Sequence, residues 1–233
     1  LDALPHAITF FLLFIWLSSL CVKELDTNNL PELGAHDSIA KFLKRRDVLG
    51  FIVGCFFVKV AHGPYYTFYT IYLDAWGYSE SAIGWLWSLS VVAELVMFFV
   101  FIMFLRKLSL VQILTLSALT GMLRWLLIGL APGNLILLVA AQLLHAITFA
   151  SYHAAAVNWV REVFGRQYQG QGQALYSAVS FGAGSAVGAI ISGYIWTDNM
   201  SFNWTVSWLF AVVVSLVAGL VFYLSLKPNR VAD

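Results

Sequence analysis

The sequence predicts an all-α membrane protein, and three observations carry that prediction: its composition, its long apolar runs and the positions of its charges. Of the 233 residues, 61% are hydrophobic and only 11% are charged, whereas about a quarter of a soluble domain is charged. Because so few charges cannot keep the surface of a soluble protein hydrated, most of this surface must face lipid. The formal net charge of +1 says little about partners, so the positions of the charges matter more than their sum.

A helix needs about 20 apolar residues to span the hydrocarbon core of a bilayer, and seven apolar segments approach or reach this length. They cover residues 5–22, 48–72, 83–105, 110–130, 135–157, 174–195 and 204–226. A long polar stretch sets the first segment apart, and the other six follow one another through short loops. We therefore expect one helix in residues 1–22, a loop in residues 23–47 and a six-helix bundle in residues 48–233.

The basic residues gather on one side of the expected membrane. If the loop at 23–47 is cytoplasmic, eleven of the thirteen Lys and Arg residues fall on the cytoplasmic side. The loops on the opposite side, at 74–81, 131–134 and 197–203, contain no Lys or Arg. Cytoplasmic loops of membrane proteins carry such an excess of basic residues. We therefore expect a multi-pass protein of the cell inner (plasma) membrane, with the long loop and the C-terminus in the cytoplasm.

Other classes of protein find little support in the sequence. Cys21 and Cys55 both fall within apolar segments, so we expect buried free thiols rather than a disulfide framework or a metal site. The sequence shows no nucleophile–base pair, no Gly-rich phosphate loop and no cluster of metal ligands, so we expect neither an enzyme nor a bound cofactor or metal. The basic run before Asp47 is explained by membrane orientation, so no nucleic-acid partner is expected.

Ionisable side chains inside the apolar segments are the strongest functional signal. They are Lys59, His62, Glu94, Arg124, His145 and His153. An ionised group at this depth costs at least a few kcal/mol, so each must face a partner or a watery cavity. Lys59, Glu94 and His145 each lie about 10 to 12 residues from one end of their segment, or roughly 15 to 18 Å along a helix. Three ionisable groups from three helices therefore share one level near the middle of the membrane.

The second segment combines a polar face with a helix breaker. Lys59, His62, Tyr66 and Tyr69 are spaced i, i+3, i+7 and i+10, which predicts one polar and aromatic face. Pro64 follows closely, removes one backbone hydrogen bond and predicts a kink. Kinked helices at membrane depth commonly mark the binding region of carriers, although a kink without a function is an equal alternative.

Two interpretations of the ionisable groups remain open. In the first they line a central cavity and carry protons and substrate charge, with Glu94 as the best candidate for the proton carrier. In the second, Glu94 forms a buried ion pair with Lys59 or Arg124 that only fixes the register of the helices. A single histidine can also simply hydrogen-bond a neighbouring helix.

Glycines recur in the segment at 174–195, at positions 182, 184, 188 and 193. Gly184 and Gly188 have the small-xxx-small spacing that lets two helix backbones approach closely in lipid. This spacing suits static packing, or the rocking of one half of a carrier against the other.

Four stretches resemble a known family. Residues 59–84, KVAHGPYYTFYTIYLDAWGYSESAIG, are similar to the seventh helix and following loop of the phenylpropionate permease group of the major facilitator superfamily. The runs SVVAELVMFF, LLHAITFASYHAAAVNWV and GQGQALYSAVSFGAGSAVG match the same group in order. The resemblance implies a twelve-helix carrier, of which helices six to twelve are present here. It also implies that the carrier moves a small solute together with protons, and that the N-terminal half of the same carrier is a partner of this chain.

A more distant resemblance, to the lactose permease group, concerns single residues. Arg124 matches an Arg on the ninth helix of that group, and His145 matches a His on the tenth. Thr148 stands where that group has a Glu central to proton coupling, so Glu94 or a histidine would have to take this part. The pair Arg106 and Lys107 retains only the basic end of the superfamily's loop signature.

These observations lead to one principal hypothesis and two alternatives. The principal hypothesis is proton-coupled uptake of a small organic solute, such as an aromatic acid like 3-phenylpropionate, with a lipid bilayer, protons and the solute as partners. The substrate and proton pathway would be built from Lys59, His62, Tyr66, Tyr69, Glu94, Arg124, His145 and His153. The first alternative is a nucleoside or sugar proton symporter, and the second is a membrane scaffold or receptor that transports nothing.

Overall fold

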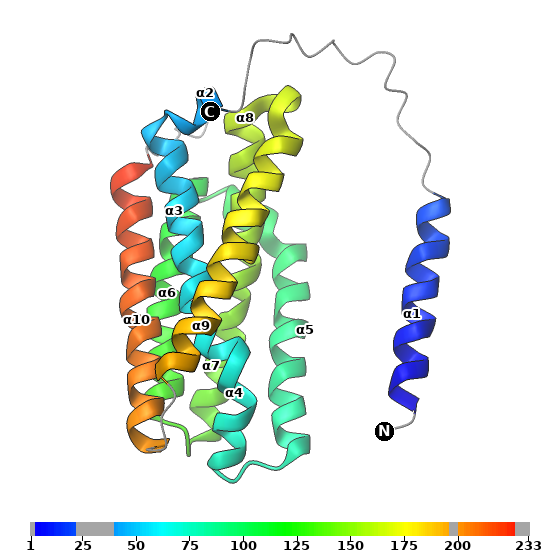
Figure 1. The fold of residues 1–233 in the computed structure, drawn as a ribbon, viewed down its shortest axis with the longest axis vertical. Helices are drawn as coiled ribbons and strands as arrows, with labels where there is room; N and C mark the ends of the chain where they lie inside the picture. The colour runs from blue at the N-terminus through cyan, green and yellow to red at the C-terminus, as the bar shows by residue number, and fades with distance from the viewer. Residues whose placement is uncertain (1–2, 22–39, 196–199, 227–233) are drawn as a thin grey trace. The chain divides into compact units, whose positions relative to one another are not determined.

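The structure is a computed structural model that describes residues 3–21, 40–195 and 200–226 (Figure 1). These residues are helical almost throughout, and they contain no strand. Residues 23–39 of the expected loop and the C-terminal residues 227–233 lie outside the described part. The all-α prediction is confirmed.

The chain divides into two compact units, residues 1–37 and 38–233, and each is described by itself. In the first unit the structure describes one helix, α1 (Ala3–Leu20). Cys21 follows α1 and is exposed, so the expectation of a buried thiol is wrong at this position. A single helix has no interior in which to bury a side chain. Cys55 in the second unit is buried, as expected.

The second unit is a helical bundle. Its helices are α2 (Ala40–Leu43), α3 (Arg46–Ala61), α4 (Gly63–Ala75), α5 (Glu80–Leu105), α6 (Leu110–Leu130), α7 (Leu135–His145), η2 (Ala146–Ser151), α8 (Tyr152–Ser177), η3 (Ala178–Gly184), α9 (Ser185–Ile195) and α10 (Met200–Ser225). The elements η2 and η3 are π-helical. Five helical stretches of the described residues are long and apolar enough to cross a membrane, against the seven expected from the sequence.

One of these five stretches contains two of the expected helices. The sequence predicts them at 135–157 and 174–195, and the stretch Leu135–Ile195 holds both, on either side of a sharp turn in α8. Only Gly165 leaves the helical region within α8, with φ 65° and ψ 177°, a conformation that glycine adopts without a steric cost. The chain folds back there, since Gln173 donates a hydrogen bond to the carbonyl of Val157 at 3.1 Å. Helix α1, with 18 residues, corresponds to the segment expected at 5–22 and is not among these five stretches.

The break in the second predicted segment is confirmed. The helix stops at Ala61 and starts again at Gly63, and Pro64 lies in the first turn of α4. His62 stands between the two helices with φ −81° and ψ −7°. Because proline lacks a backbone N–H and its ring clashes with the preceding turn, the carbonyls of that turn cannot all be satisfied within one straight helix.

The close approach predicted by the glycine spacing is also confirmed. A Cβ added to Gly188 would lie 2.7 Å from the carbonyl oxygen of Val60, and one added to Gly63 would lie 2.4 Å from the carbonyl carbon of Gly188. A Cβ on Gly184 would lie 2.9 Å from the carbonyl oxygen of Phe56. Gly182 and Gly193 instead face open space. Helix α9 therefore crosses the chain at the break between α3 and α4.

Three of the other helices begin at side-chain caps. Ser79 accepts a hydrogen bond from the N–H of Ala82 at the start of α5, and Asn134 caps α7. Ser109 and Gln112 form a reciprocal capping box at the start of α6. Such caps satisfy N–H groups that have no partner within the helix.

The helices differ greatly in how far the bundle encloses them. In Arg46–Ala75, 72% of an apolar 18-residue stretch is buried, whereas in Glu80–Leu105 the buried share of such a stretch is 17%. Helix α3 lies beside α10 and α9 (Figure 1), and it also packs against η3. The chain around the break thus lies inside the bundle, while α5 exposes a largely apolar surface.

Candidate substrate and proton site

Glu94 on α5 is paired with a histidine. Its Oε1 lies 2.7 Å from Nε2 of His145 on α7, and the two side chains are 19% and 3% exposed. The alternative ion pair of Glu94 with Lys59 or Arg124 is not formed among the described residues, because the ion-pair contact of Glu94 is to His145. The contact needs one proton between the two atoms, which either side chain can supply. The pair can therefore hold a single proton, the one between these two atoms, or a second one on Nδ1 of His145.

Arg124 on α6 is completely buried. Its Nε donates a hydrogen bond to the carbonyl of Ala141 at 3.0 Å. Its Cζ lies 4.2 Å from the ring centroid of Tyr65 and 4.5 Å from that of Trp125. The two terminal nitrogens, Nη1 and Nη2, have no hydrogen-bond partner. A buried guanidinium with two free nitrogens is costly unless something else binds them.

A hydrogen-bonded network of Tyr65, Gln142 and Tyr69 lies beside Arg124, and we call it the tyrosine–glutamine network. The hydroxyl of Tyr65 donates to Oε1 of Gln142 at 2.9 Å, and Nε2 of Gln142 donates to the hydroxyl of Tyr69 at 2.5 Å. All three side chains are completely buried. The network links α4 to α7.

Lys59 on α3 is surrounded by aromatic rings. Its Nζ lies 4.1 Å from the ring centroid of Phe149, 3.9 Å from that of Phe181 and 5.8 Å from that of Tyr66. Phe149 belongs to η2 and Phe181 to η3, so both π-helical elements place a ring on this ammonium. Among the described residues, no carboxylate forms an ion pair with Lys59.

His62, at the helix break, has one free nitrogen. Its Nδ1 lies 2.7 Å from the carbonyl of Val58, and since a carbonyl only accepts, Nδ1 carries the hydrogen. Nε2 is buried and has no partner. The imidazole lies 5.0 Å from the ring of Trp125 and 6.1 Å from that of His145. His145 likewise has a buried Nδ1 without a partner.

The structure brings most of the eight expected site residues together and leaves two of them, Tyr66 and His153, at the edge. Lys59, His62, Glu94, Arg124, His145 and the tyrosine–glutamine network are in contact directly or through one ring, and we call them together the polar cluster. Tyr66 stacks on His62 but is 48% exposed. His153 lies at the edge, where its Nδ1 meets the hydroxyl of Tyr176 at 3.0 Å.

Sequence reasoning missed Tyr65 and Gln142. The spacing that starts at Lys59 selects Tyr66 and Tyr69, whereas Tyr65 lies three residues after His62 and four before Tyr69, on the same helical face as both. A signal for Gln142 was present: it is the sole amide in the segment at 135–157 and lies three residues before His145, on the same helical face.

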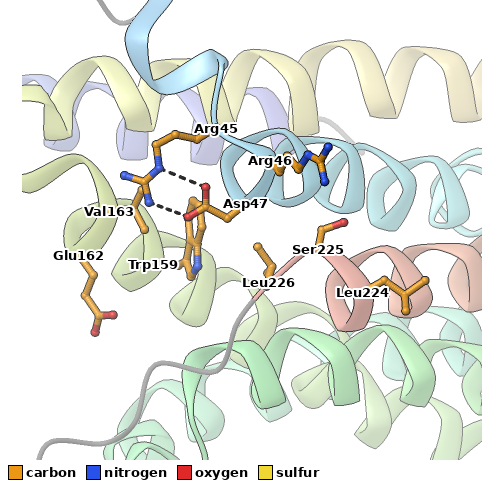
Figure 2. A pocket seen from close by; sticks show the side chains of 9 residues that line it. All are labelled: Arg45, Arg46, Asp47, Trp159, Glu162, Val163, Leu224, Ser225 and Leu226. Carbon is orange, nitrogen blue, oxygen red and sulfur yellow. Dashed lines mark hydrogen bonds and ion pairs between the residues drawn. The ribbon is translucent and has the colours of Figure 1, made fainter.

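A cavity of about 840 Å³ lies elsewhere, where α3 begins and α10 ends (Figure 2). It is lined by Arg45, Arg46, Asp47, Trp159, Glu162, Val163, Leu224, Ser225 and Leu226. Arg45 and Asp47 form an ion pair of 2.6 Å at its rim. None of these residues belongs to the polar cluster. Among the described residues, no group of three or more His, Cys, Asp or Glu side chains could hold a metal ion.

Comparison with known proteins shows the family. The model of the MFS_1-like family matches residues 1–208, which is most of the chain. The chain belongs to the MFS_1-like family. It is therefore an all-α membrane protein of the major facilitator type.

Three curated relatives of the MFS_1-like chain are transporters by name. A probable 3-phenylpropionic acid transporter of Escherichia coli (strain K12) is 39% identical over 136 residues, which cover 58% of this chain and 35% of the relative. Two Bacillus subtilis (strain 168) proteins, the uncharacterized transporter YwbF and the uncharacterized MFS-type transporter YxaM, are 24% and 27% identical. They match 88% and 93% of this chain and 52% and 55% of their own lengths. The chain thus spans between a third and just over a half of these relatives.

A solved structure shares the fold of this MFS_1-like chain. The nucleoside transporter NupG (D323A mutant) superposes with a TM-score of 0.70 at 19% sequence identity, over 86% of this chain and 57% of NupG. At this identity the likeness concerns the fold alone.

Proposed function

We propose that this chain forms the second half of a secondary transporter that takes up a small organic acid together with protons. The observation that carries the proposal is the set of unpartnered nitrogens in the polar cluster, on Arg124, His62 and His145. Burying such donors and acceptors without partners costs free energy. A scaffold that binds no ligand would gain nothing from that cost, whereas a carrier offers these atoms to its ligand and to protons.

The preferred substrate class is a carboxylate with an aromatic body, such as 3-phenylpropionate. Arg124 and Lys59 supply the positive charge, and the rings of Tyr65, Trp125 and Phe149 supply apolar surface around it. The name of the Escherichia coli relative supports the same class. A nucleoside or sugar is the second candidate, because tyrosine, tryptophan and histidine side chains also suit hydroxylated ligands.

The pair of Glu94 and His145 is the proposed proton carrier. It joins α5, the least enclosed spanning helix, to α7, so a change in its protonation alters a contact between two helices. A carrier must couple ligand binding to such a rearrangement. In this proposal the carrier resides in the inner membrane, with its central loop and C-terminus in the cytoplasm as the basic residues indicate.

Replacing Glu94 by Gln tests the proton step. Glu94→Gln keeps a hydrogen-bonding side chain of nearly the same size but cannot exchange a proton. We expect proton-driven uptake of labelled 3-phenylpropionate by cells or proteoliposomes to fall by about 100-fold or more, within the range of general acid–base effects. Exchange of labelled for unlabelled solute without a proton gradient should persist. Equal loss of uptake and exchange in a well-expressed variant would contradict the assignment.

Competition separates the substrate classes. In cells that express the carrier, unlabelled 3-phenylpropionate should compete with labelled 3-phenylpropionate, and a nucleoside or a sugar should not. The opposite pattern would favour the second candidate. Failure to transport any of these probes would favour a scaffold or receptor.

A further inference from the structure

Arg124 can present only one edge to a ligand. Its Nε is already used by the carbonyl of Ala141, and the rings of Tyr65 and Trp125 cover the guanidinium. The nitrogens that remain, Nη1 and Nη2, are buried and unpartnered. Two N–H donors in one plane match the two oxygens of a carboxylate, provided that the plane is held at a fixed angle.

The tyrosine–glutamine network connects the two contacts that fix the guanidinium plane of Arg124, the ring of Tyr65 and the carbonyl of Ala141. The ring of Tyr65 lies against the guanidinium, and its hydroxyl is fixed by Gln142. Gln142 directly follows Ala141, whose carbonyl accepts from Arg124. Tyr69 completes the network by accepting from Gln142. The ring on α4 and the carbonyl on α7 are thereby tied to each other next to Arg124.

We infer that Tyr65 and Gln142 are positioning residues that hold the Arg124 guanidinium with its Nη1 and Nη2 edge turned to the substrate carboxylate. This inference rests on the proposed function, since it takes the anion site of that carrier as given. It adds that selection of an acid over its neutral amide depends on two uncharged side chains that touch Arg124 or its backbone partner. Neither side chain needs to touch the substrate.

The transport test compares Tyr65→Phe with Tyr72→Phe in the intact carrier. Tyr65→Phe keeps the ring on Arg124 and removes the bond to Gln142. Tyr72→Phe is a matched control, because Tyr72 is also buried on α4 and donates to the carbonyl of Ile128 at 2.7 Å. The probes are 3-phenylpropionate and its uncharged amide, 3-phenylpropionamide.

Tyr65→Phe should raise KM for 3-phenylpropionate about tenfold while kcat changes by less than about twofold, the pattern expected when a binding contact is weakened. The apparent affinity for the amide should not change, and Tyr72→Phe should alter neither value. A purely structural role would change both probes alike, or would make the two variants equivalent, and either result would overturn the inference.

A second readout does not depend on transport. In the purified carrier in nanodiscs, ¹⁵N NMR should resolve separate Nη1 and Nη2 signals for Arg124, because a held guanidinium rotates slowly about its Cζ–Nε bond. The signals are assigned with Arg124→Lys. They should merge in Tyr65→Phe and in Gln142→Met, which breaks the same bond from the other side, and should stay separate in Tyr72→Phe. Separate signals in both test variants would refute the positioning role. If the wild type transports neither probe, the proposed substrate class fails, while the NMR result still decides the inference.

Discussion

The two buried cations of the polar cluster, Arg124 and Lys59, are held in different ways. Arg124 donates a hydrogen bond to the α7 backbone and lies against a tyrosine that is itself hydrogen-bonded. Lys59 is held by aromatic rings, from Phe149 and Phe181 at about 4 Å. The helices that hold Arg124 are regular, whereas both of these rings come from π-helical elements.

This difference teaches that equal charge does not mean an equal role. Hydrogen bonds depend on direction, so they fix the angle of the Arg124 plane. Attraction between a cation and an aromatic face tolerates movement, and π-helical turns are frequent at functional sites. Within the proposed function, we therefore expect Arg124 to bind the carboxylate in a fixed orientation and Lys59 to act as a movable charge.

The largest expected effect belongs to Arg124→Leu. Loss of the charged donors should raise KM for 3-phenylpropionate about 100-fold or more, as when one partner of a buried charged contact is removed. The melting temperature of the purified carrier should not fall, because a buried charge with free donors contributes little to stability. A sharp fall in melting temperature would show that Arg124 is structural and would remove the contrast with Lys59.

Lys59→Met should have a smaller and different effect. If Lys59 moves during the cycle, kcat should fall about tenfold while KM for 3-phenylpropionate changes by less than about threefold. Initial rates over a range of substrate concentrations measure both constants. A rise in KM as large as that of Arg124→Leu would mean that both cations bind the carboxylate, and the contrast would be wrong.

The smallest effect should come from Tyr69→Phe. This change removes an acceptor at the far end of the tyrosine–glutamine network but leaves the bond between Tyr65 and Gln142 intact. Loss of one neutral hydrogen bond is worth about 1 kcal/mol, so KM should rise about fivefold or less. The same uptake assay measures it. If Tyr69→Phe raised KM more than Tyr65→Phe does, Tyr69 rather than Tyr65 would be the residue that mainly positions Arg124.

The parts of the fold that the sequence predicted depend on local physics. The break at His62 follows from Pro64, and the close crossing follows from the spacing of Gly184 and Gly188. The turn at Gly165 was missed, because polar residues around it suggested a loop. Those residues are helical on both sides of the turn, since their backbone hydrogen bonds do not require an apolar sequence.

The candidate site was harder to predict, because its geometry depends on pairs of helices. Depth along the membrane correctly put Glu94 and His145 at one level, but depth does not tell which helices are neighbours. The contact that the structure shows for Glu94, with His145, was therefore not among the alternatives considered. Tyr65 was overlooked because the spacing was counted from Lys59, although Tyr65 lies four residues before Tyr69 on the same helical face.

The contact between Gly63 and Gly188 also limits how this family can vary in sequence. Backbone atoms fill the space where a side chain would begin at either position, and backbone cannot turn aside as a flexible side chain can. A homologue with alanine at one of these positions must have a wider crossing between α9 and the start of α4, and with it a different spacing around Lys59 and His62. Glycine at both positions is therefore a simple criterion for choosing relatives whose substrate preferences can be compared directly with those of this protein.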